Sequence, residues 1–101
     1  YDEAVVYLDQ QIGLLLETLQ KMGKWDSTMV VLTADHGEEF WDHEGFSHYL
    51  ARLYDELLHI PLLIRLSGQR TGGRVARQVR QIDIAPTVLD HLGVSSPPSF
   101  C

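Results

Sequence analysis

The feature that most constrains the fold is a continuous run of apolar and β-branched residues at 28–33. The run has no alternation with polar residues, which is typical of a strand buried on both faces, as in a parallel sheet covered by helices. A second run of this kind lies at 60–66, where Pro61 is tolerated near the start of the strand. We therefore expect two buried strands of an α/β sheet.

The sequence before the first run has the spacing of an amphipathic helix. Between Asp2 and Met22, apolar residues recur three and four positions apart, so they share one face of a helix. Acidic residues at its start and Lys21 near its end complement the helix dipole. Gly23 is well placed to follow the helix and end it.

The rest of the chain predicts three shorter elements. Residues 49–58 have helical spacing, and residues 75–82 alternate apolar and polar side chains, as in a half-exposed or edge strand. A last helix is expected to begin at Asp83 or Ala85 and to end before Gly93. This order of helices and strands predicts half of an α/β layer.

Composition narrows the class of protein. Of 101 residues, 45% are hydrophobic and 22% are charged, which is ordinary for a globular domain. The formal net charge of −6 argues against nucleic-acid binding, which needs clustered Lys and Arg. No apolar run reaches the roughly 18 residues of a membrane span. The single cysteine, Cys101, forms no disulfide within the chain. The chain begins without Met and ends soon after two prolines, so we expect a piece of a larger protein.

Asp35 and His36 follow directly after the first apolar run. In open α/β sheets, ligands bind beyond the carboxyl ends of the strands. Adjacent side chains of an extended segment point to opposite sides, but both reach one ion if the backbone turns, and Gly37 gives the backbone that freedom. A carboxylate with an imidazole suits Zn²⁺ or Mn²⁺, whereas Ca²⁺ prefers oxygen ligands alone.

The same loop is dense in ionisable side chains. An acidic loop with scattered histidines is often only a solvated surface, and Asp35 could simply cap the following turn. The junction with a fully apolar strand favours a site instead. The further ionisable residues of the loop are Glu38, Glu39, Asp42, His43, Glu44 and His48.

Four blocks of the chain, in this order, resemble the C-terminal half of the sulfatase catalytic domain, in the alkaline phosphatase superfamily. They lie at 33–40, 43–48, 53–64 and 82–89. The resemblance covers nearly the whole chain and implies that residues 1–101 are the C-terminal portion of such a domain. It also implies an alkaline-phosphatase-like sheet flanked by helices, in a three-layer α/β/α fold.

The resemblance implies roles for particular residues. Asp35 and His36 match two ligands of the catalytic divalent metal, which is Ca²⁺ in many sulfatases and Mn²⁺ or Zn²⁺ in relatives with a His at this position. His48 matches a residue that faces the substrate and contacts a sulfate or phosphate oxygen or protonates the leaving group, although His43 is an alternative. Trp41 stands where the family commonly has a small residue.

The implied activity is hydrolysis of a small-molecule or glycan sulfate ester. Alternatives are a phosphodiesterase, a phosphonate monoester hydrolase or a phosphoethanolamine transferase of the same superfamily, or a degenerate module that binds a metal or partner. The family nucleophile lies in a Cys/Ser-x-Pro-x-Arg motif whose first residue becomes formylglycine, and this chain lacks that motif. We therefore expect the 101 residues alone to be inactive. The resemblance implies no single cellular compartment.

Overall fold

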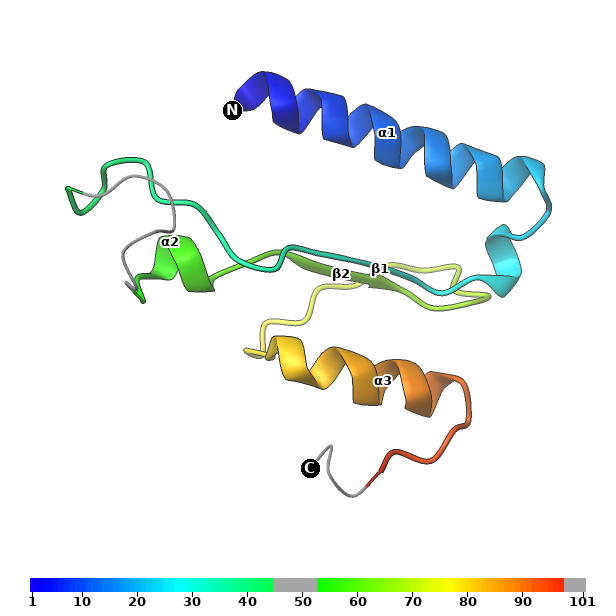
Figure 1. The fold of residues 1–101 in the computed structure, drawn as a ribbon. Helices are drawn as coiled ribbons and strands as arrows, with labels where there is room; N and C mark the ends of the chain where they lie inside the picture. The colour runs from blue at the N-terminus through cyan, green and yellow to red at the C-terminus, as the bar shows by residue number, and fades with distance from the viewer. Residues whose placement is uncertain (45–52, 98–101) are drawn as a thin grey trace. The chain divides into compact units, whose positions relative to one another are not determined.

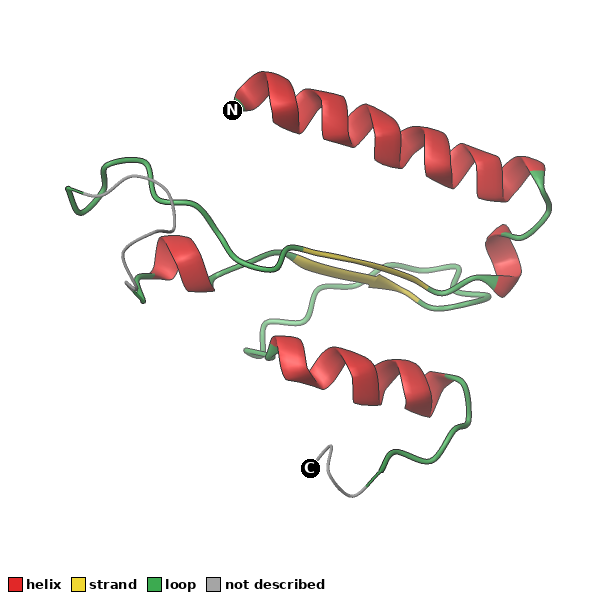
Figure 2. Cartoon of the chain, viewed as in Figure 1, coloured by secondary structure: helices red, strands yellow, loops and turns green. Residues whose placement is uncertain are grey.

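A computed structural model of the chain describes residues 1–44 and 53–97 (Figure 1). The chain divides into two units, Tyr1–Gln69 and Arg70–Cys101. Among the described residues, the first unit holds a long and a short α-helix, a 3₁₀ helix and a two-stranded sheet, and the second holds a 3₁₀ helix and an α-helix (Figure 2). No helix within the described residues is long and apolar enough to cross a membrane.

Helix α1 (Asp2–Lys21) confirms the first predicted helix. Its first turn is acidic, and Lys21 in its last turn forms an ion pair of 3.2 Å with Glu17. Gly23 has a φ of 66°, in the left-handed region that glycine adopts without steric cost, and so ends the helix as expected. None of the residues of α1 is buried.

The two apolar runs form the strands β1 (Val30–Thr33) and β2 (Leu62–Arg65). The prediction of a parallel sheet is wrong, because the strands pair antiparallel, with Val30 opposite Arg65 and Thr33 opposite Leu62. An apolar run signals burial but not strand direction, which here follows from a connection that leaves β1 and enters β2 at the same end of the sheet. Burial on both faces is not observed either, since Leu63 is 59% exposed.

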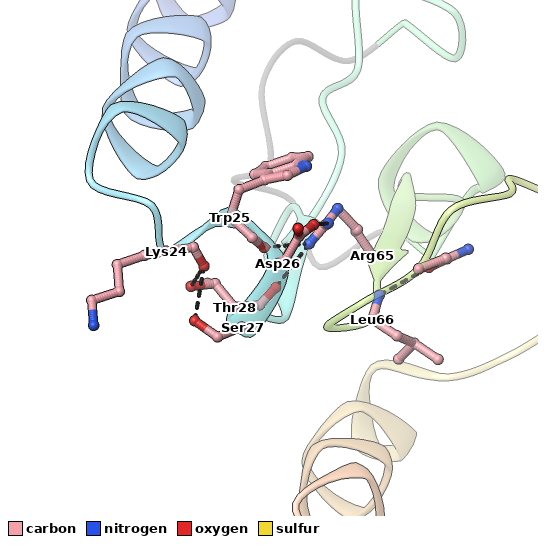
Figure 3. A network of polar contacts seen from close by, with 8 residues as sticks. Lys24, Trp25, Asp26, Ser27, Thr28, Arg65 and Leu66 are labelled. Atoms are coloured by element: carbon pink, nitrogen blue, oxygen red, sulfur yellow. Dashed lines mark hydrogen bonds and ion pairs between the residues drawn. The ribbon is translucent and has the colours of Figure 1, made fainter.

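A network of polar contacts joins the end of α1 to β2 (Figure 3). The short 3₁₀ helix η1 (Trp25–Ser27) follows α1, and the guanidinium of Arg65 lies 3.8 Å from the centre of the Trp25 ring. One guanidinium nitrogen of Arg65 donates to the carbonyls of Trp25 and Thr28, at 2.8 and 3.0 Å. Another lies 3.6 Å from Asp26 Oδ1. Arg65, the last residue of β2, therefore holds η1 against the end of this strand.

Helix α2 (Asp55–Leu58) confirms the last four residues of the predicted helix at 49–58, but Leu53 and Tyr54 are not helical, and residues 49–52 lie outside the described range. It is a single turn, preceded by Tyr54 in an extended conformation. Leu57 in α2 is 8% exposed and is the one buried hydrophobic side chain among the described residues. The small core of the first unit therefore lies where α2 meets the loop after β1.

The second unit contains the 3₁₀ helix η2 (Gln81–Asp83) and helix α3 (Ile84–His91). The predicted last helix is confirmed, with Asp83 as its N-cap residue and Gly93 at a φ of 68° beyond its end. The predicted strand at 75–82 is wrong. The Asp83 carboxylate accepts a hydrogen bond of 2.9 Å from the backbone amide of Arg80, which turns residues 81–83 into a helix start instead.

The described residues therefore combine helices with one two-stranded antiparallel sheet. This is consistent with an α/β fold. The three-layer α/β/α arrangement stays a prediction.

Candidate metal centre

The loop after β1, residues 34–44 and called the metal loop from here on, leaves the end of the sheet where β2 begins. Its backbone is tied to α2, because the amide of Gly37 donates a hydrogen bond of 2.9 Å to the carbonyl of Leu57. Asp35 and His36 lie between this tie and the last residue of β1. Both candidate ligands are therefore held between the sheet and α2.

Asp35 and His36 converge on one side of the backbone. His36 Nε2 lies 3.7 Å from Asp35 Oδ2, whereas the other carboxylate oxygen of Asp35 accepts a hydrogen bond of 3.0 Å from the His36 amide. Two ligands of one ion, each about 2.0–2.2 Å from it, lie roughly 3–3.5 Å apart. The pair fits a divalent ion with only a small closing movement.

The tautomer of His36 follows from its second ring nitrogen. Nδ1 lies 2.7 Å from the carbonyl oxygen of Gly37, which accepts hydrogen bonds only, so Nδ1 carries a proton, and in the neutral ring the lone pair is then on Nε2. Metal-binding histidines commonly hold their second nitrogen in this way. The hydrogen bond to Gly37 raises the pKa of His36, and the nearby charges of Asp35 and Glu38 act in the same direction.

Gly37 is needed for a reason other than the expected one. Its φ is not positive, so the turn does not use the conformational freedom of glycine. A Cβ at this position would instead overlap the carbonyl oxygen of Glu56 and come within 2.9 Å of its carbonyl carbon. Close approach of α2 to the metal loop therefore requires glycine at position 37.

The other acids of the metal loop shape its backbone. Glu39 is 2% exposed, and its Oε1 accepts a hydrogen bond of 3.2 Å from the amide of His43. Asp42 accepts one of 3.3 Å from the amide of Phe40. Trp41 lies between them at a φ of 72°, in the left-handed region, where a residue with a side chain is strained.

Within residues 1–44 and 53–97, no group of three His, Cys, Asp or Glu side chains is placed to hold an ion. Asp35 and His36 thus form a pair of candidate ligands rather than a complete site. His48, the candidate substrate-facing residue, lies outside the described residues.

The structure also shows contacts of His43 that sequence reasoning missed. The His43 ring stacks on Tyr54, with centroids 3.7 Å apart and planes inclined by 13°. Its Nδ1 lies 3.8 Å from Glu56 Oε2, within ion-pair distance but beyond hydrogen-bond distance. No periodicity or motif relates these residues, because the long loop separates them in sequence.

Comparison with known proteins identifies the family. The Sulfatase family profile matches residues 1–94. The chain is 34% identical to arylsulfatase K of Mus musculus over 91% of its length. It is 35% identical, over 96% of its length, both to an N-acetylglucosamine-6-O-sulfatase of Bacteroides thetaiotaomicron and to the multifunctional alkaline phosphatase superfamily protein PehA of Trinickia caryophylli.

The chain spans only 16%, 17% and 19% of the length of these relatives, in the order arylsulfatase K, the N-acetylglucosamine-6-O-sulfatase and PehA. No solved structure matches it. The profile match covers well over half of the chain, and the apolar strand followed by the Asp35–His36 pair lies within it. The chain therefore belongs to the sulfatase family.

Proposed function

We propose that this chain supplies Asp35 and His36 as two ligands of a divalent metal in an enzyme that hydrolyses sulfate esters. The nucleophile and the remaining ligands of this enzyme, called the whole enzyme below, lie outside the 101 residues, which form the C-terminal portion of its catalytic domain. The observation that carries the proposal is the 3.7 Å separation of His36 Nε2 and Asp35 Oδ2, with the proton of His36 on Nδ1. Membership of the sulfatase family and the names of the relatives support sulfate esters as the substrates.

A divalent ion bound there acts as a Lewis acid and stabilises the charge that develops on the transferring oxyanion. Asp35 contributes a carboxylate that is 89% exposed and therefore open to an ion. His36 contributes a neutral imidazole whose orientation the Gly37 carbonyl fixes. One nitrogen and one oxygen ligand suit Mn²⁺ or Zn²⁺, and Ca²⁺ is the alternative that the family resemblance supplies.

His48 is proposed as the residue that contacts the substrate. A histidine near its ordinary pKa can donate a hydrogen bond to a sulfate oxygen or a proton to the leaving group. The alternative is His43, and the contacts that His43 makes within the protein favour His48. The ring face of His43 lies on Tyr54 and its Nδ1 faces Glu56, so the side chain is already engaged within the protein.

The test is replacement of each ligand in the whole enzyme, with bound metal and aryl sulfate hydrolysis measured on the same preparations. Asp35→Ala and His36→Ala should each lower metal affinity by more than about 100-fold, beyond the usual cost of losing a group that only orients a ligand. Asp9→Ala, in the exposed face of α1, is the matched control and should leave both quantities unchanged. Wild-type metal content and turnover in Asp35→Ala would refute the assignment.

A second candidate substrate class is the phosphate or phosphonate esters. The match to a multifunctional alkaline phosphatase superfamily protein favours it, together with the histidine at position 36. Rates of the whole enzyme on an aryl sulfate and on an aryl phosphonate monoester separate the two classes. Metal binding without turnover of either ester would instead indicate a degenerate binding module. The 101 residues alone should bind metal weakly and turn over neither ester.

A further inference from the structure

His43 joins the end of the metal loop to the residues that begin α2. Its ring lies face to face with Tyr54 at 3.7 Å, and its Nδ1 lies 3.8 Å from the Glu56 carboxylate. Its backbone amide donates to the carboxylate of Glu39, the most deeply buried side chain among the described residues. The imidazole thus contacts Tyr54 and Glu56, both beyond residues 45–52, whereas the backbone amide of the same residue is bonded to Glu39.

The backbone of α2 continues these contacts to the ligand His36. The carbonyl of Glu56 lies against the α-carbon of Gly37, and the carbonyl of Leu57 accepts a hydrogen bond of 2.9 Å from the Gly37 amide. The Gly37 carbonyl in turn holds His36 Nδ1 at 2.7 Å. An unbroken series of contacts therefore runs from the His43 ring, through α2 and Gly37, to the His36 ring.

Helix α2 depends on contacts of this kind for its position. It has only four residues and no side-chain hydrogen bond at its N-cap. A single helical turn is not stable in water by itself, because its nucleation is unfavourable and only a few hydrogen bonds repay it. Aromatic stacking of His43 on Tyr54 and the approach to Glu56 hold the start of this turn.

We propose that His43 is a positioning residue for His36, acting through Tyr54, the N-cap residue of α2, and through Glu56 within α2. This inference rests on the proposed metal site. When the His43 ring is absent, α2 is no longer held against the metal loop, and the Leu57 carbonyl no longer fixes Gly37. The Gly37 carbonyl then loses its fixed direction, and His36 loses the hydrogen bond that selects its tautomer.

The test is made on the whole enzyme, with Mn²⁺ as the probe. His43→Leu and Tyr54→Leu should each raise the Mn²⁺ dissociation constant about tenfold, at the lower end of the effect of groups that orient a metal ligand. Tyr54→Phe keeps the stacked ring and should stay within about twofold of wild type. His59→Gln, an exposed histidine one residue beyond α2, is the matched control and should bind Mn²⁺ as wild type does.

A second readout distinguishes positioning from a general structural role. In the metal-free enzyme labelled with ¹⁵N-histidine, the ring nitrogens of His36 should report the Nδ1-protonated tautomer in wild type and Tyr54→Phe. His43→Leu and Tyr54→Leu should show a mixture of tautomers. If His43→Leu does not fold, the Tyr54→Leu and Tyr54→Phe pair decides the question alone.

The outcomes separate this inference from the function on which it rests. Unchanged Mn²⁺ affinity and an unchanged His36 tautomer in both leucine variants, with metal lost in Asp35→Ala, would overturn the role of His43 and leave the metal site standing. A lowered unfolding temperature of the two leucine variants, with an unchanged His36 tautomer, would also overturn the role of His43. A wild-type enzyme that binds no Mn²⁺, Zn²⁺ or Ca²⁺ would remove the proposed function itself.

Discussion

Replacement of Gly37 by alanine tests the junction between the metal loop and α2. The added Cβ would overlap the carbonyl oxygen of Glu56, far inside the 3.0 Å that real Cβ contacts keep, and would lie 3.1 Å from the Leu57 α-carbon. These are backbone atoms, so no side chain can rotate away to make room. The φ of Gly37 is not positive, and alanine therefore adds a steric effect without a conformational one.

The size of the effect follows from two contributions. Forcing a methyl group into a packed site costs about 1–3 kcal/mol. If α2 retreats until the Cβ is accommodated, the 2.9 Å hydrogen bond from Gly37 to Leu57 is lost, which costs about 1 kcal/mol more. We therefore expect Gly37→Ala to lower the free energy of unfolding by about 2–4 kcal/mol. Metal affinity should fall by about 10- to 100-fold, because the Gly37 carbonyl also orients His36.

Urea unfolding and Mn²⁺ titration of the whole enzyme measure both effects. Gly13→Ala is the matched control. Gly13 lies inside α1 with no atom within 4 Å of an added Cβ, so alanine there should raise the free energy of unfolding by about 0.5–1 kcal/mol. Replacement of glycine by alanine is thus expected to lower the free energy of unfolding at position 37 and to raise it at position 13. A Gly37→Ala enzyme that is as stable as Gly13→Ala and binds Mn²⁺ like wild type would refute the argument.

Three further predictions concern strain, packing and pH. Trp41 has a φ of 72°, a left-handed conformation that penalises any Cβ, so the Trp41→Gly variant should have a free energy of unfolding about 1 kcal/mol higher than Trp41→Ala in urea. Equal stabilities of the two variants would show that the backbone there is not strained. Arg65→Lys should lower the free energy of unfolding by about 1–2 kcal/mol, since lysine cannot replace the planar guanidinium that bonds two carbonyls and stacks on a ring; Arg74→Lys, at an exposed site, should have no effect. The hydrogen bond from the side chain of Arg80 lowers the pKa of Asp83 below its ordinary 3.8. The stability that the ionised Asp83 carboxylate gives to the start of α3 is therefore complete above pH 3.8 and is lost as the pH falls below this value. The protection of the α3 amides against exchange, relative to the intrinsic rate at each pH, should therefore fall on acidification more in wild type than in Asp83→Asn, and equal responses would contradict this account.

The parts of the fold that the sequence predicted correctly carry local signals. Helix α1 was predicted from spacing within its own residues, and its end from Gly23, whose φ of 66° is a property of a single residue. The start of α3 at Asp83 is local in the same sense. Such signals need only a few neighbouring residues, and the structure adds little to them beyond the bounds of each element.

The errors concern interactions between segments far apart in the chain. The apolar run at 28–33 predicted a strand correctly, but its antiparallel pairing with β2 depends on the path of the connection, which periodicity does not contain. The alternation at 75–82 satisfied the pattern of a strand, but the sheet that the described residues form contains only β1 and β2. The carboxylate of Asp83 bonded the Arg80 amide instead. A strand needs a second segment, whereas a helix start needs only its own first turn.

The proximity of the two candidate ligands could be predicted from the sequence, but the contacts that hold them could not. Asp35 and His36 are adjacent in sequence, so their common location needed no knowledge of the fold. The contact of His43 with Tyr54 and Glu56 required two segments to meet across residues 45–52, which no pattern within either segment contains. His48, beyond the described residues, stays a prediction.

Gly37 shows why the geometry of the candidate pair Asp35 and His36 depends on the residue that follows it. Its amide donates to Leu57 and its carbonyl accepts from His36, so both of its backbone groups are used at once. A side chain at this position would push α2 away and release both groups together. With glycine, the Gly37 carbonyl sets the direction of the His36 ring in the absence of an ion, so the proposed binding would not have to order the ring. The proposed metal site therefore depends on the backbone of α2 as well as on the two candidate ligands.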